Sequence, residues 1–275
     1  MRVRVWPVRD ARGNDGPLLL ALHGWAESGE AFGPLAAGLR RRWTVVAPDA
    51  PAHGGTPWRG GRRYSLEEQA LGVRALVDAL PRRGSDRRIV LLGHGMGALT
   101  AARVAAMRAA DVVHLVLEEP SRTAVRGRRS HKDLWTWLVR RQAEDWGERL
   151  AYAAASYPGW SEEDREIWAR GTAQVDPAHL TVPLDWGEPL GPLLTGVRCP
   201  VTIVHGRRDR GGIVGPAAAH RCAAACPGGG EVVGFARAGH HPRREAGDLF
   251  CALLGEVLER CGPPDLDGGD VSRTA

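Results

Sequence analysis

The sequence predicts an α/β fold in which a mostly parallel central sheet is flanked by helices and carries an inserted helical cap. Seven short apolar runs alternate with amphipathic stretches, and one long segment, residues 121–198, interrupts this alternation. Strands that alternate with helices form parallel sheets, because each helix returns the chain to the same end of the sheet. We therefore expect a body built from residues 1–120 and 199–261, with strands at 3–8, 18–22, 43–48, 88–93, 112–118, 200–205 and 231–235.

Two of the connecting stretches have clear helix signals. Ser65-Leu66-Glu67-Glu68 is a capping box, in which a serine and a glutamate three residues later satisfy the free N–H groups of a helix start. Apolar residues then recur at helical spacing until the chain reaches Pro81. The last amphipathic stretch has the same spacing, and both helices should cover the sheet with their apolar faces. The residues concerned are Leu66, Ala70, Val73, Val77 and Leu80, and Phe250, Leu253, Leu254, Val257 and Leu258.

The segment 121–198 has mixed helical signals and predicts the cap. Amphipathic tryptophan rings suit a surface that closes over an apolar ligand, but they also suit simple packing of a cap on a body. Residues 262–275, rich in glycine, proline and aspartate, predict a disordered tail. Six of the ten tryptophans of the chain lie in the cap segment: Trp135, Trp137, Trp146, Trp160, Trp168 and Trp186.

The charge pattern argues against several classes of partner. The formal net charge is +5, Lys132 is the only lysine, and the arginines are scattered in small groups. Nucleic-acid binding normally clusters basic residues on one element, so we expect no nucleic-acid partner. No apolar stretch has the length of a membrane span or the layout of a signal peptide. We therefore expect a cytoplasmic protein with a small-molecule substrate and no membrane partner, while the oligomeric state stays open.

The cysteines predict reduced thiols. Their number, five, is odd in a long chain, and their spacing lacks the pairing with histidine that is typical of zinc sites. Cys222 and Cys226 lie one helical turn apart in an alanine-rich segment, which favours small core residues over a redox or metal role. We expect neither a metal nor a cofactor.

A strand that runs into a glycine-spaced turn carries the strongest signal. Residues 90–97 read Val-Leu-Leu-Gly-His-Gly-Met-Gly, and a predicted helix begins directly after them. A glycine-rich dinucleotide loop would follow the first strand, whereas this turn follows the fourth. The segment resembles the nucleophile elbow of the α/β-hydrolase fold superfamily, whose pattern is G-x-S-x-G. Gly93 and Gly97 match its flanks, and Gly95 stands where the nucleophilic serine would be.

Further segments match the same family in chain order and imply the other parts of its site. Leu22-His23-Gly24-Trp25 follows the second strand, where the resemblance implies an oxyanion hole formed by the backbone N–H groups of Trp25 and Met96. Residues 48–56 resemble a turn of the family that we interpret as structural. Gly206-Arg207-Arg208-Asp209 and Gly239-His240 resemble the acid and histidine loops. The resemblance therefore implies a catalytic dyad of Asp209 and His240, with His241 as the alternative histidine.

Four other residues are candidates for contact with a substrate. Glu119 ends the fifth strand, at the sheet edge where some members of the family place a working acid. It could serve there as a second base or contact the substrate, although a capping or salt-bridged glutamate would fit the same position. His94, within the elbow, and Trp135 and Trp137, in the cap, complete this group.

Glycine at the elbow removes the acyl-enzyme step, because it has no oxygen to attack a carbonyl carbon. Ser28 and Ser121 lie on loops nearby, but neither is on an elbow. Two functions stay open at this point. One is an enzyme of secondary metabolism that uses a histidine base for water-mediated hydrolysis, elimination, cyclisation or decarboxylation of a small apolar or aromatic metabolite. The other is an inactive binding protein, because glycine relieves the strain of the elbow.

Overall fold

A seven-stranded sheet forms the centre of the molecule in the computed structural model, which describes residues 1–8, 18–39, 43–80, 88–107, 111–121 and 131–261. All seven predicted strand segments contribute to this sheet, with ends that differ from the predictions by a few residues. The strands are β1 (Val3–Trp6), β2 (Leu18–Leu22), β3 (Thr44–Pro48), β5 (Ile89–His94), β6 (Val112–Glu118), β8 (Val201–His205) and β9 (Gly230–Gly234).

The strand order is β1-β3-β2-β5-β6-β8-β9, and only β1 runs antiparallel to its neighbour. Parallel strands place their carboxyl ends at one edge, so the loops after β2, β5, β6 and β8 meet there. His94 at the end of β5 pairs in register with Glu118 at the end of β6, and Glu118 with Val204 of β8. The register thus brings the elbow, the Glu118-Glu119 pair and the Asp209 loop to one edge.

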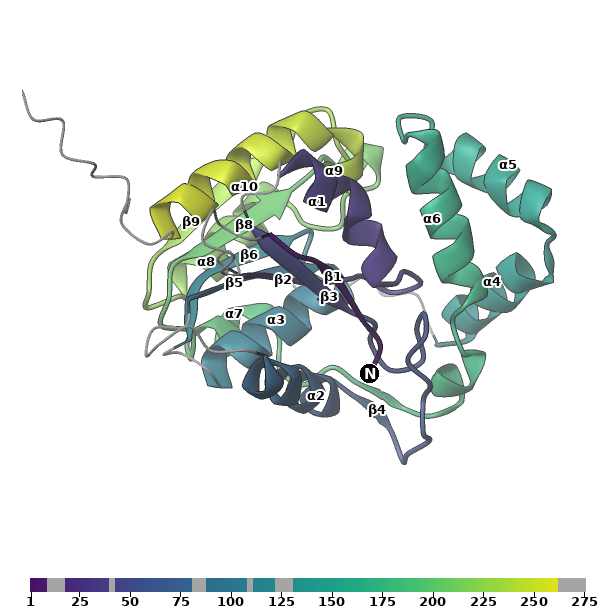
Figure 1. Cartoon of the computed structure of the whole chain (residues 1–275), viewed down its shortest axis with the longest axis horizontal. Coiled ribbons are helices and arrows are strands. Elements are labelled where there is room, and N and C mark those ends of the chain that lie inside the picture. The colour runs from purple at the N-terminus through teal and green to yellow at the C-terminus, as the bar shows by residue number, and fades with distance from the viewer. Residues whose placement is uncertain (9–17, 40–42, 81–87, 108–110, 122–130, 262–275) are drawn as a thin grey trace, which may run out of the picture.

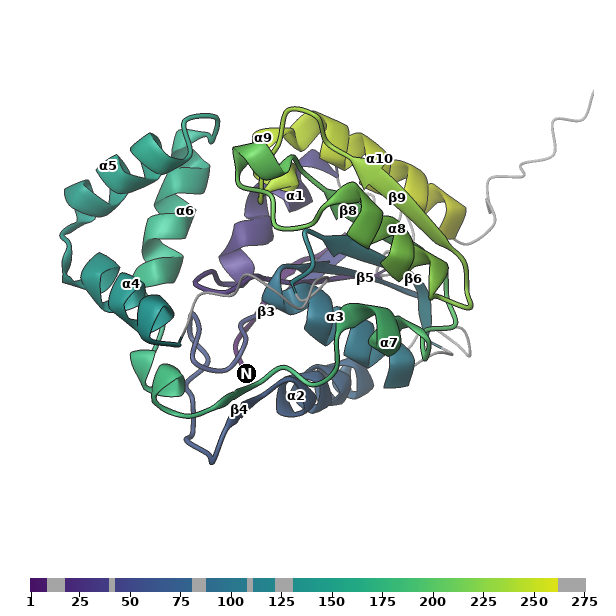
Figure 2. The same ribbon diagram turned by 180° about the vertical axis from the view of Figure 1, so that it is seen from behind.

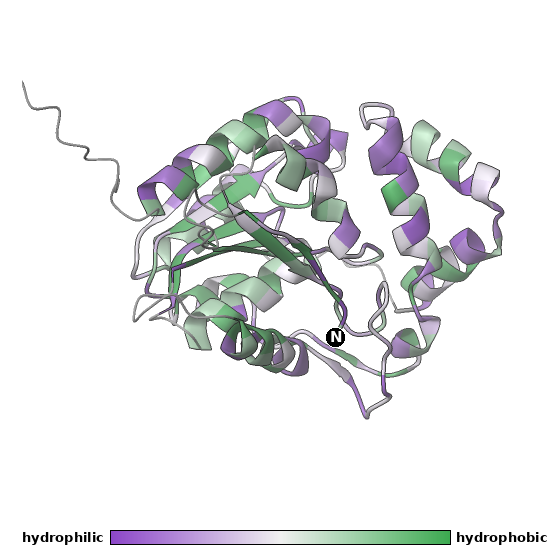
Figure 3. Ribbon diagram, in the orientation of Figure 1, coloured by the Kyte–Doolittle hydropathy of each residue, from purple (hydrophilic) through white to green (hydrophobic). Residues whose placement is uncertain are grey.

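Helices cover both faces of the sheet, as the amphipathic stretches predict (Figure 1). One face packs against α2 (Leu66–Ala79), α3 (Met96–Met107), α7 (Leu190–Leu194) and α8 (Pro216–Ala224). The other packs against α1 (Gly33–Gly38) and α10 (Gly247–Cys261). The central strands are mostly apolar and the outer helices alternate in hydropathy (Figure 3), so the core lies in two layers, one on each face of the sheet.

The sequence signals for the helices agree with these elements. The Ser65 hydroxyl accepts a hydrogen bond from the Glu68 N–H at the start of α2. In α10, Phe250, Leu254 and Val257 are buried, as their spacing predicts. The fold class is therefore confirmed as an α/β fold with a mostly parallel central sheet.

Three helices stand apart from the two covering layers and form the cap (Figures 1 and 2). They are α4 (His131–Ala143), α5 (Trp146–Ser156) and α6 (Glu162–Ala173), followed by the 3₁₀ turn η2 (Pro177–Thr181). A cluster of aromatic rings packs the three helices together, with Tyr152 stacked on Trp168 and Tyr157 on Trp160. The tryptophans of this cluster therefore hold the cap itself together. The cap meets the body where α6 contacts η1 (Gly29–Phe32).

The end of the predicted cap segment packs on the body. Two short strands, β4 (Tyr64–Ser65) and β7 (Leu184–Asp185), pair with each other. The α7 residues Leu190 and Leu194 then enter the core beside α3. Residues 190–198 thus contact the body, although the sequence predicts a cap up to residue 198. The remaining short elements are η3 (Arg208–Arg210) and α9 (Pro242–Glu245). The tail 262–275, for which the sequence predicts disorder, lies outside the described residues.

Within the described part of the chain, every helix is too short or too polar to cross a lipid bilayer.

Candidate active site

The turn between β5 and α3 has the geometry of a nucleophile elbow. Gly95 links the strand to the helix with φ of +53°, a value that L-residues rarely adopt. A Cβ on Gly93 would overlap the carbonyl oxygen of Gly97, and a Cβ on Gly97 would overlap that of Leu22. Both flanking positions therefore require glycine, because the turn presses strand, helix and neighbouring loop together.

Gly95 faces the ring of His240. A Cβ built on Gly95 would lie 3.8 Å from Nε2 of His240 and 3.9 Å from the Cα of Gly24, with nothing closer. A serine hydroxyl at this position, one bond further out, would come within hydrogen-bond reach of Nε2. Nε2 of His240 thus points toward the position where a nucleophile elbow carries its nucleophile. The His240 side chain is 31% exposed, so a small molecule can reach it.

Glu119 is the carboxylate that contacts His240. Its Oε2 lies 3.4 Å from Nδ1 of His240, and its side chain is fully buried. The same carboxylate accepts hydrogen bonds from the N–H groups of Gly206 at 2.7 Å, Ile213 at 2.5 Å and Val214 at 3.2 Å. Burial by itself would raise the pKa of Glu119, but the His240 contact and the backbone N–H donors outweigh burial and lower it. Glu119 is therefore an ionised carboxylate held against the imidazole.

Asp209 does not take the place predicted for it. Its side chain is 63% exposed and forms an ion pair with Arg207, with N–O distances of 2.9 and 2.5 Å. The predicted pairing of Asp209 with His240 is thus wrong in this structure, and Glu119 takes that position from the neighbouring strand. The physical reason is the η3 turn, which directs Asp209 to solvent, whereas Glu119 points back under the His240 loop.

The two predicted oxyanion donors lie on either side of the elbow. Met96 is the first residue of α3, where N–H groups have no partner within the helix and the helix dipole favours negative charge. Trp25 follows Gly24, whose Cα approaches Gly95. Among the described residues, neither backbone N–H donates a hydrogen bond to another group. Both N–H groups are therefore available to an oxygen above Gly95.

The sequence predicts that His94 contacts a substrate, but the structure contradicts this prediction. The His94 side chain is buried and offers no surface to a substrate. Its Nδ1 lies 3.1 Å from Oε2 of Glu27, and its Nε2 lies 3.0 Å from the carbonyl oxygen of His240. Glu27 also pairs with Arg243 at 2.8 Å and with Arg244 at 2.9 Å. Sequence reasoning did not single out these three charged residues, because nothing in a one-dimensional pattern marks a charge as buried.

His241, the alternative histidine, faces the cap. Its ring makes edge contacts with Tyr157 and Trp160, and burial holds its pKa well below the ordinary value. Side-chain nitrogens of His94, His240 and His241 lie within 4.8 Å of one another. Nε2 of His94 faces a carbonyl oxygen and needs its hydrogen there, so it is not free to bind a metal. We therefore assign no metal to this group.

Of the two cap tryptophans singled out from the sequence, Trp137 lies near the site and Trp135 does not contact it. The Trp137 ring lies 5.4 Å from that of Trp25, and its Nε1 donates to the Tyr152 hydroxyl at 3.2 Å. Trp135 is 44% exposed on α4. Trp25 is held from a second side, because its Nε1 donates to Nε2 of His179 at 3.2 Å. Trp25 is thus held in place by residues of α4 and η2.

The two nearby serines have structural partners. The Ser28 side chain caps η1, and the Ser121 hydroxyl donates to the Gly95 carbonyl oxygen at 3.1 Å. Neither hydroxyl contacts His240 among the described residues. The structure therefore offers no replacement for the missing serine at these two positions.

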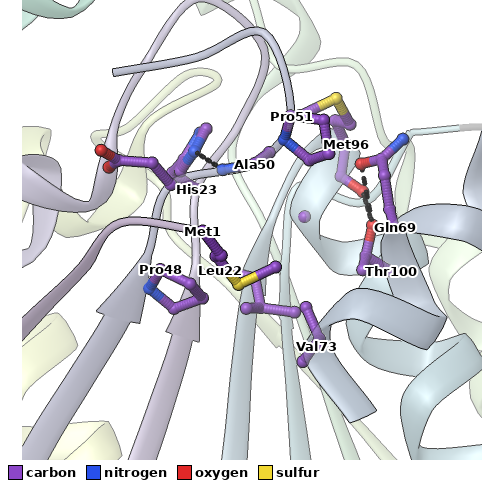
Figure 4. Close-up of a pocket in the computed structure, with 12 residues that line it drawn as sticks. Met1, Leu22, His23, Pro48, Ala50, Pro51, Gln69, Val73, Met96 and Thr100 are labelled. Atoms are coloured by element: carbon purple, nitrogen blue, oxygen red, sulfur yellow. Dashed lines mark hydrogen bonds between the residues drawn. The ribbon is translucent and has the colours of Figure 1, made fainter. Parts of the chain in front are cut away.

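A separate pocket is lined by residues at the start of α3 and at the ends of β2 and β3 (Figure 4). The Thr100 hydroxyl donates to the Gln69 side-chain oxygen at 3.4 Å, and the His23 ring accepts from the Ala50 N–H at 2.9 Å. Among the described residues, the side-chain nitrogen of Gln69 has no hydrogen-bond partner. Apolar groups dominate the wall, and the His240–Glu119 pair does not line it. The lining residues are Met1, Leu22, His23, Pro48, Asp49, Ala50, Pro51, Gln69, Val73, Met96, Gly97 and Thr100.

Comparison with known families and curated proteins gives consistent results. Residues 19–253 match the model of the Alpha/beta hydrolase family. Lipase LipV of Mycobacterium tuberculosis is 29% identical over 156 residues, which cover 56% of each chain. The Magnesium-chelatase 30 kDa subunit of Rhodobacter capsulatus is 33% identical over 100 residues, 36% of this chain and 34% of that protein. The matched part thus spans about a third to about half of these relatives.

Solved structures extend the likeness over nearly the whole chain. E-2-(Acetamidomethylene)succinate hydrolase has a TM-score of 0.69 and 22% identity, covering 94% of this chain and 95% of its own. The thioesterase domain from the curacin biosynthetic pathway has a TM-score of 0.66 and 20% identity, covering 94% and 100%. At these identities the likeness establishes the fold alone.

Proposed function

Because this chain belongs to the Alpha/beta hydrolase family, we propose that it is an enzyme that works without a serine nucleophile and uses His240 as a general base, backed by Glu119. The observation that carries the proposal is the direction of the His240 ring. Nε2 faces the position of the missing nucleophile at Gly95, while Nδ1 faces a buried carboxylate. This arrangement fixes one tautomer and stabilises the ring once it gains a proton.

In the hydrolytic form of the proposal, Nε2 of His240 takes a proton from a water molecule above Gly95. The water oxygen attacks the carbonyl carbon of the substrate, and the carbonyl electron pair moves onto its oxygen. The N–H groups of Trp25 and Met96 stabilise that oxyanion. When the intermediate collapses, the leaving group departs with the proton held by His240. Positioned bases contribute about 10² to 10⁴ in rate, and an oxyanion donor about 10² to 10³.

In the second form, His240 removes a proton from a carbon next to a carbonyl of the substrate. The resulting enolate oxygen accepts hydrogen bonds from the same donors. In an elimination the enolate re-forms its carbonyl and expels a leaving group from the β-carbon, and that group takes the proton from His240. In a cyclisation the enolate carbon attacks a second carbonyl carbon of the substrate, whose oxygen takes that proton. Decarboxylation would use the donors alone, because loss of carbon dioxide generates the enolate directly. All these reactions share a negative oxygen above the start of α3, so they share the N–H donors of Trp25 and Met96.

The walls around the donors favour an apolar substrate with flat or aromatic character. Met96 and Trp25 pack into one apolar cluster, with partners from the loops and from the segment that follows the cap. A surface of this kind binds rings through area burial and offset stacking. The cluster contains Ala52, Tyr64 and Met96, packed against Trp25, Ala50, Trp58, Val182, Leu184 and Trp186.

One observation supports an enzyme over an inactive binding protein. A site in which catalysis no longer matters would be expected to relax its strained positions, as Gly95 has done relative to a serine. Glu119, however, keeps φ of +43° beside His240. A non-glycine residue in this conformation costs about 1 to 3 kcal/mol, which supports continued use of its carboxylate.

The arrangement is tested by restoring the nucleophile. The native protein should not react with a fluorophosphonate probe at the elbow, whereas Gly95→Ser should be phosphonylated there. His240→Ala in the Gly95→Ser background should abolish labelling, and Glu119→Gln should slow it by roughly 10² to 10⁴. Asp209→Asn is the matched control and should leave the rate unchanged. Rapid labelling of the native protein at another serine would contradict the proposal.

The reaction of the native protein is tested by untargeted metabolite analysis. Extracts incubated with native protein are compared with extracts incubated with His240→Ala. A compound consumed by the native protein alone would support the enzyme and identify the substrate. A compound that is retained unaltered by both proteins would instead support the binding function.

A further inference from the structure

We propose that His94 is a positioning residue that holds the His240 loop in place, as a doubly protonated ring clamped between Glu27 and the His240 carbonyl oxygen. His94 precedes Gly95 in the elbow, and its side chain is only 2% exposed. Its role as a positioning residue for catalysis rests on the proposed function. The contacts that define the clamp stand independently of that function.

Both nitrogens of His94 face groups that can only accept hydrogen bonds. Nδ1 lies 3.1 Å from a carboxylate oxygen of Glu27, and Nε2 lies 3.0 Å from the backbone carbonyl oxygen of His240. A neutral imidazole carries one N–H and would leave one of these contacts between two lone pairs. Satisfying both contacts requires an N–H at each nitrogen, and therefore a positively charged ring.

The surrounding charges favour this protonation state. Three carboxylates, from the loop after β2, from β6 and from α6, meet two guanidinium groups from α9 in a buried cluster. Counting these five groups leaves one negative charge in excess, and a charged His94 ring neutralises it. Buried charge is costly unless it is paired, so a neutral cluster is the stable one. The cluster consists of Glu27, Glu118, Asp164, Arg243 and Arg244.

The other titratable groups around His94 are His240 and His241, in the loop after β9, and His23, which precedes Gly24 in the loop after β2. The His240 ring lies 4.8 Å from that of His94, and its nitrogens face Gly95 and Glu119. The His241 ring also lies 4.8 Å away and is kept neutral by burial. Burial likewise lowers the pKa of His23, whose nitrogens are engaged by Gly24 and Ala50. None of these rings faces a nitrogen of His94 as a hydrogen-bond partner.

Through this clamp, three loops that carry the site become one unit. Glu27 also accepts the Gly24 N–H at 2.9 Å, directly before the oxyanion donor Trp25. In the elbow, Nδ1 of His94 contacts Glu27, and Nε2 of His94 contacts the backbone carbonyl oxygen of His240. Misplacement of a base by about 1 Å can cost roughly 10² in rate. Loss of the clamp should therefore slow proton transfer without changing the walls that bind the substrate.

Histidine side-chain NMR of the native protein tests the clamp without any substrate. His94 is assigned by the signals lost in His94→Gln. Its two nitrogens should both carry a slowly exchanging hydrogen at neutral pH, and the His240 ring signals should move in His94→Leu. They should stay unchanged in His114→Gln, which alters another buried histidine, hydrogen-bonded to Thr202 away from the site. A neutral His94 ring, or an unmoved His240 signal, would overturn the proposal.

Labelling kinetics then test the effect on reactivity in the Gly95→Ser background. His94→Leu should lower the limiting rate of phosphonylation by roughly tenfold to a hundredfold. The half-saturating probe concentration and the final extent of labelling should stay the same, because a misfolded fraction would lower extent instead of rate. His94→Gln keeps one donor and should recover part of the rate, and His114→Gln should match the parent. An unchanged limiting rate in His94→Leu would refute the positioning role.

The two sets of results separate the inference from the proposed function. If Gly95→Ser fails to label while His94 shows both N–H groups and moves the His240 signals, the clamp stands and the proposed reaction geometry fails. If Gly95→Ser labels rapidly but His94 is neutral and its replacement has no effect, the proposed function stands and the clamp is refuted.

Discussion

Glu119 concentrates strain, burial and hydrogen bonding in one residue. Its backbone has φ of +43°, its side chain is fully buried, and its carboxylate receives three backbone N–H groups besides His240. Sequence reasoning left a capping role and a catalytic role as alternatives. In the structure the same carboxylate caps the loop that follows β8 and contacts Nδ1 of His240.

The effect of Glu119 on stability should depend on pH. Its pKa is lowered in the folded state, so its carboxylate stabilises the fold fully above the unfolded pKa of about 4.3, and the contribution is lost as pH falls through the folded value. Glu119→Gln should lower the free energy of unfolding by about 2 to 3 kcal/mol at pH 7. Urea unfolding of both proteins should show this difference shrink as the pH is lowered below 4.3. A difference that grows towards acid would contradict the assignment.

The elbow shows how one element can favour glycine for two different reasons. Gly97 is required by space, because any Cβ would overlap the Leu22 carbonyl oxygen. Gly95 has room for a side chain, and only its positive φ disfavours one. The missing nucleophile is therefore a property of the sequence, since the fold would still accept a serine there.

Alanine substitutions at Gly95 and Gly97, with Gly159 as a control, should separate the effect of positive φ from the effect of limited space. Gly95→Ala should cost about 1 to 2 kcal/mol, the usual penalty for an L-residue in the left-handed region. Gly97→Ala should cost clearly more, because a backbone oxygen has to move. Gly159→Ala is the control, since no atom lies within 4 Å of its built Cβ. Thermal unfolding of the three variants measures the order, and equal losses at positions 95 and 97 would contradict it.

At the scale of the whole molecule, a buried cluster of charges joins the cap to the body. The Arg244 guanidinium contacts Glu27 at 2.9 Å, Asp164 of α6 at 3.5 Å and the Trp160 ring at 4.3 Å from its centroid. Arg243 continues the cluster to Glu118 at the end of β6. The cap, the loop after β2 and the sheet edge therefore form ion pairs with the same two arginines.

Removing the central anion should destabilise the molecule strongly. Glu27→Gln leaves Arg243 and Arg244 without their shared carboxylate, and breaking a buried pair in this way costs about 3 to 5 kcal/mol. Glu67→Gln is the matched control, because its pair with Arg103 lies at the surface and is worth about 0 to 1 kcal/mol. Urea unfolding at pH 7 measures both changes. A loss below that of Glu67→Gln would show that the cluster does not stabilise the fold.

The sequence by itself determined the fold class, the seven strand segments, the elbow with its missing nucleophile, and His240 as the histidine that faces it. These features depend on local chemistry: apolar periodicity forms strands and helices, and close backbone contacts require Gly93 and Gly97. Each signal lies within a few consecutive residues, so it can be recognised without knowing the rest of the structure.

Only the tertiary structure decided which carboxylate contacts His240 and which charged side chains are buried. Asp209 and Glu119 both follow strands at the same sheet edge, and the choice between them depends on the direction in which each loop leaves that edge. Glu27 and Arg243 are 216 residues apart in the chain and meet at 2.8 Å. Contacts of this kind arise from the packing of loops from separate elements. The contacts that His94 and Glu27 make can therefore be identified only in the folded chain.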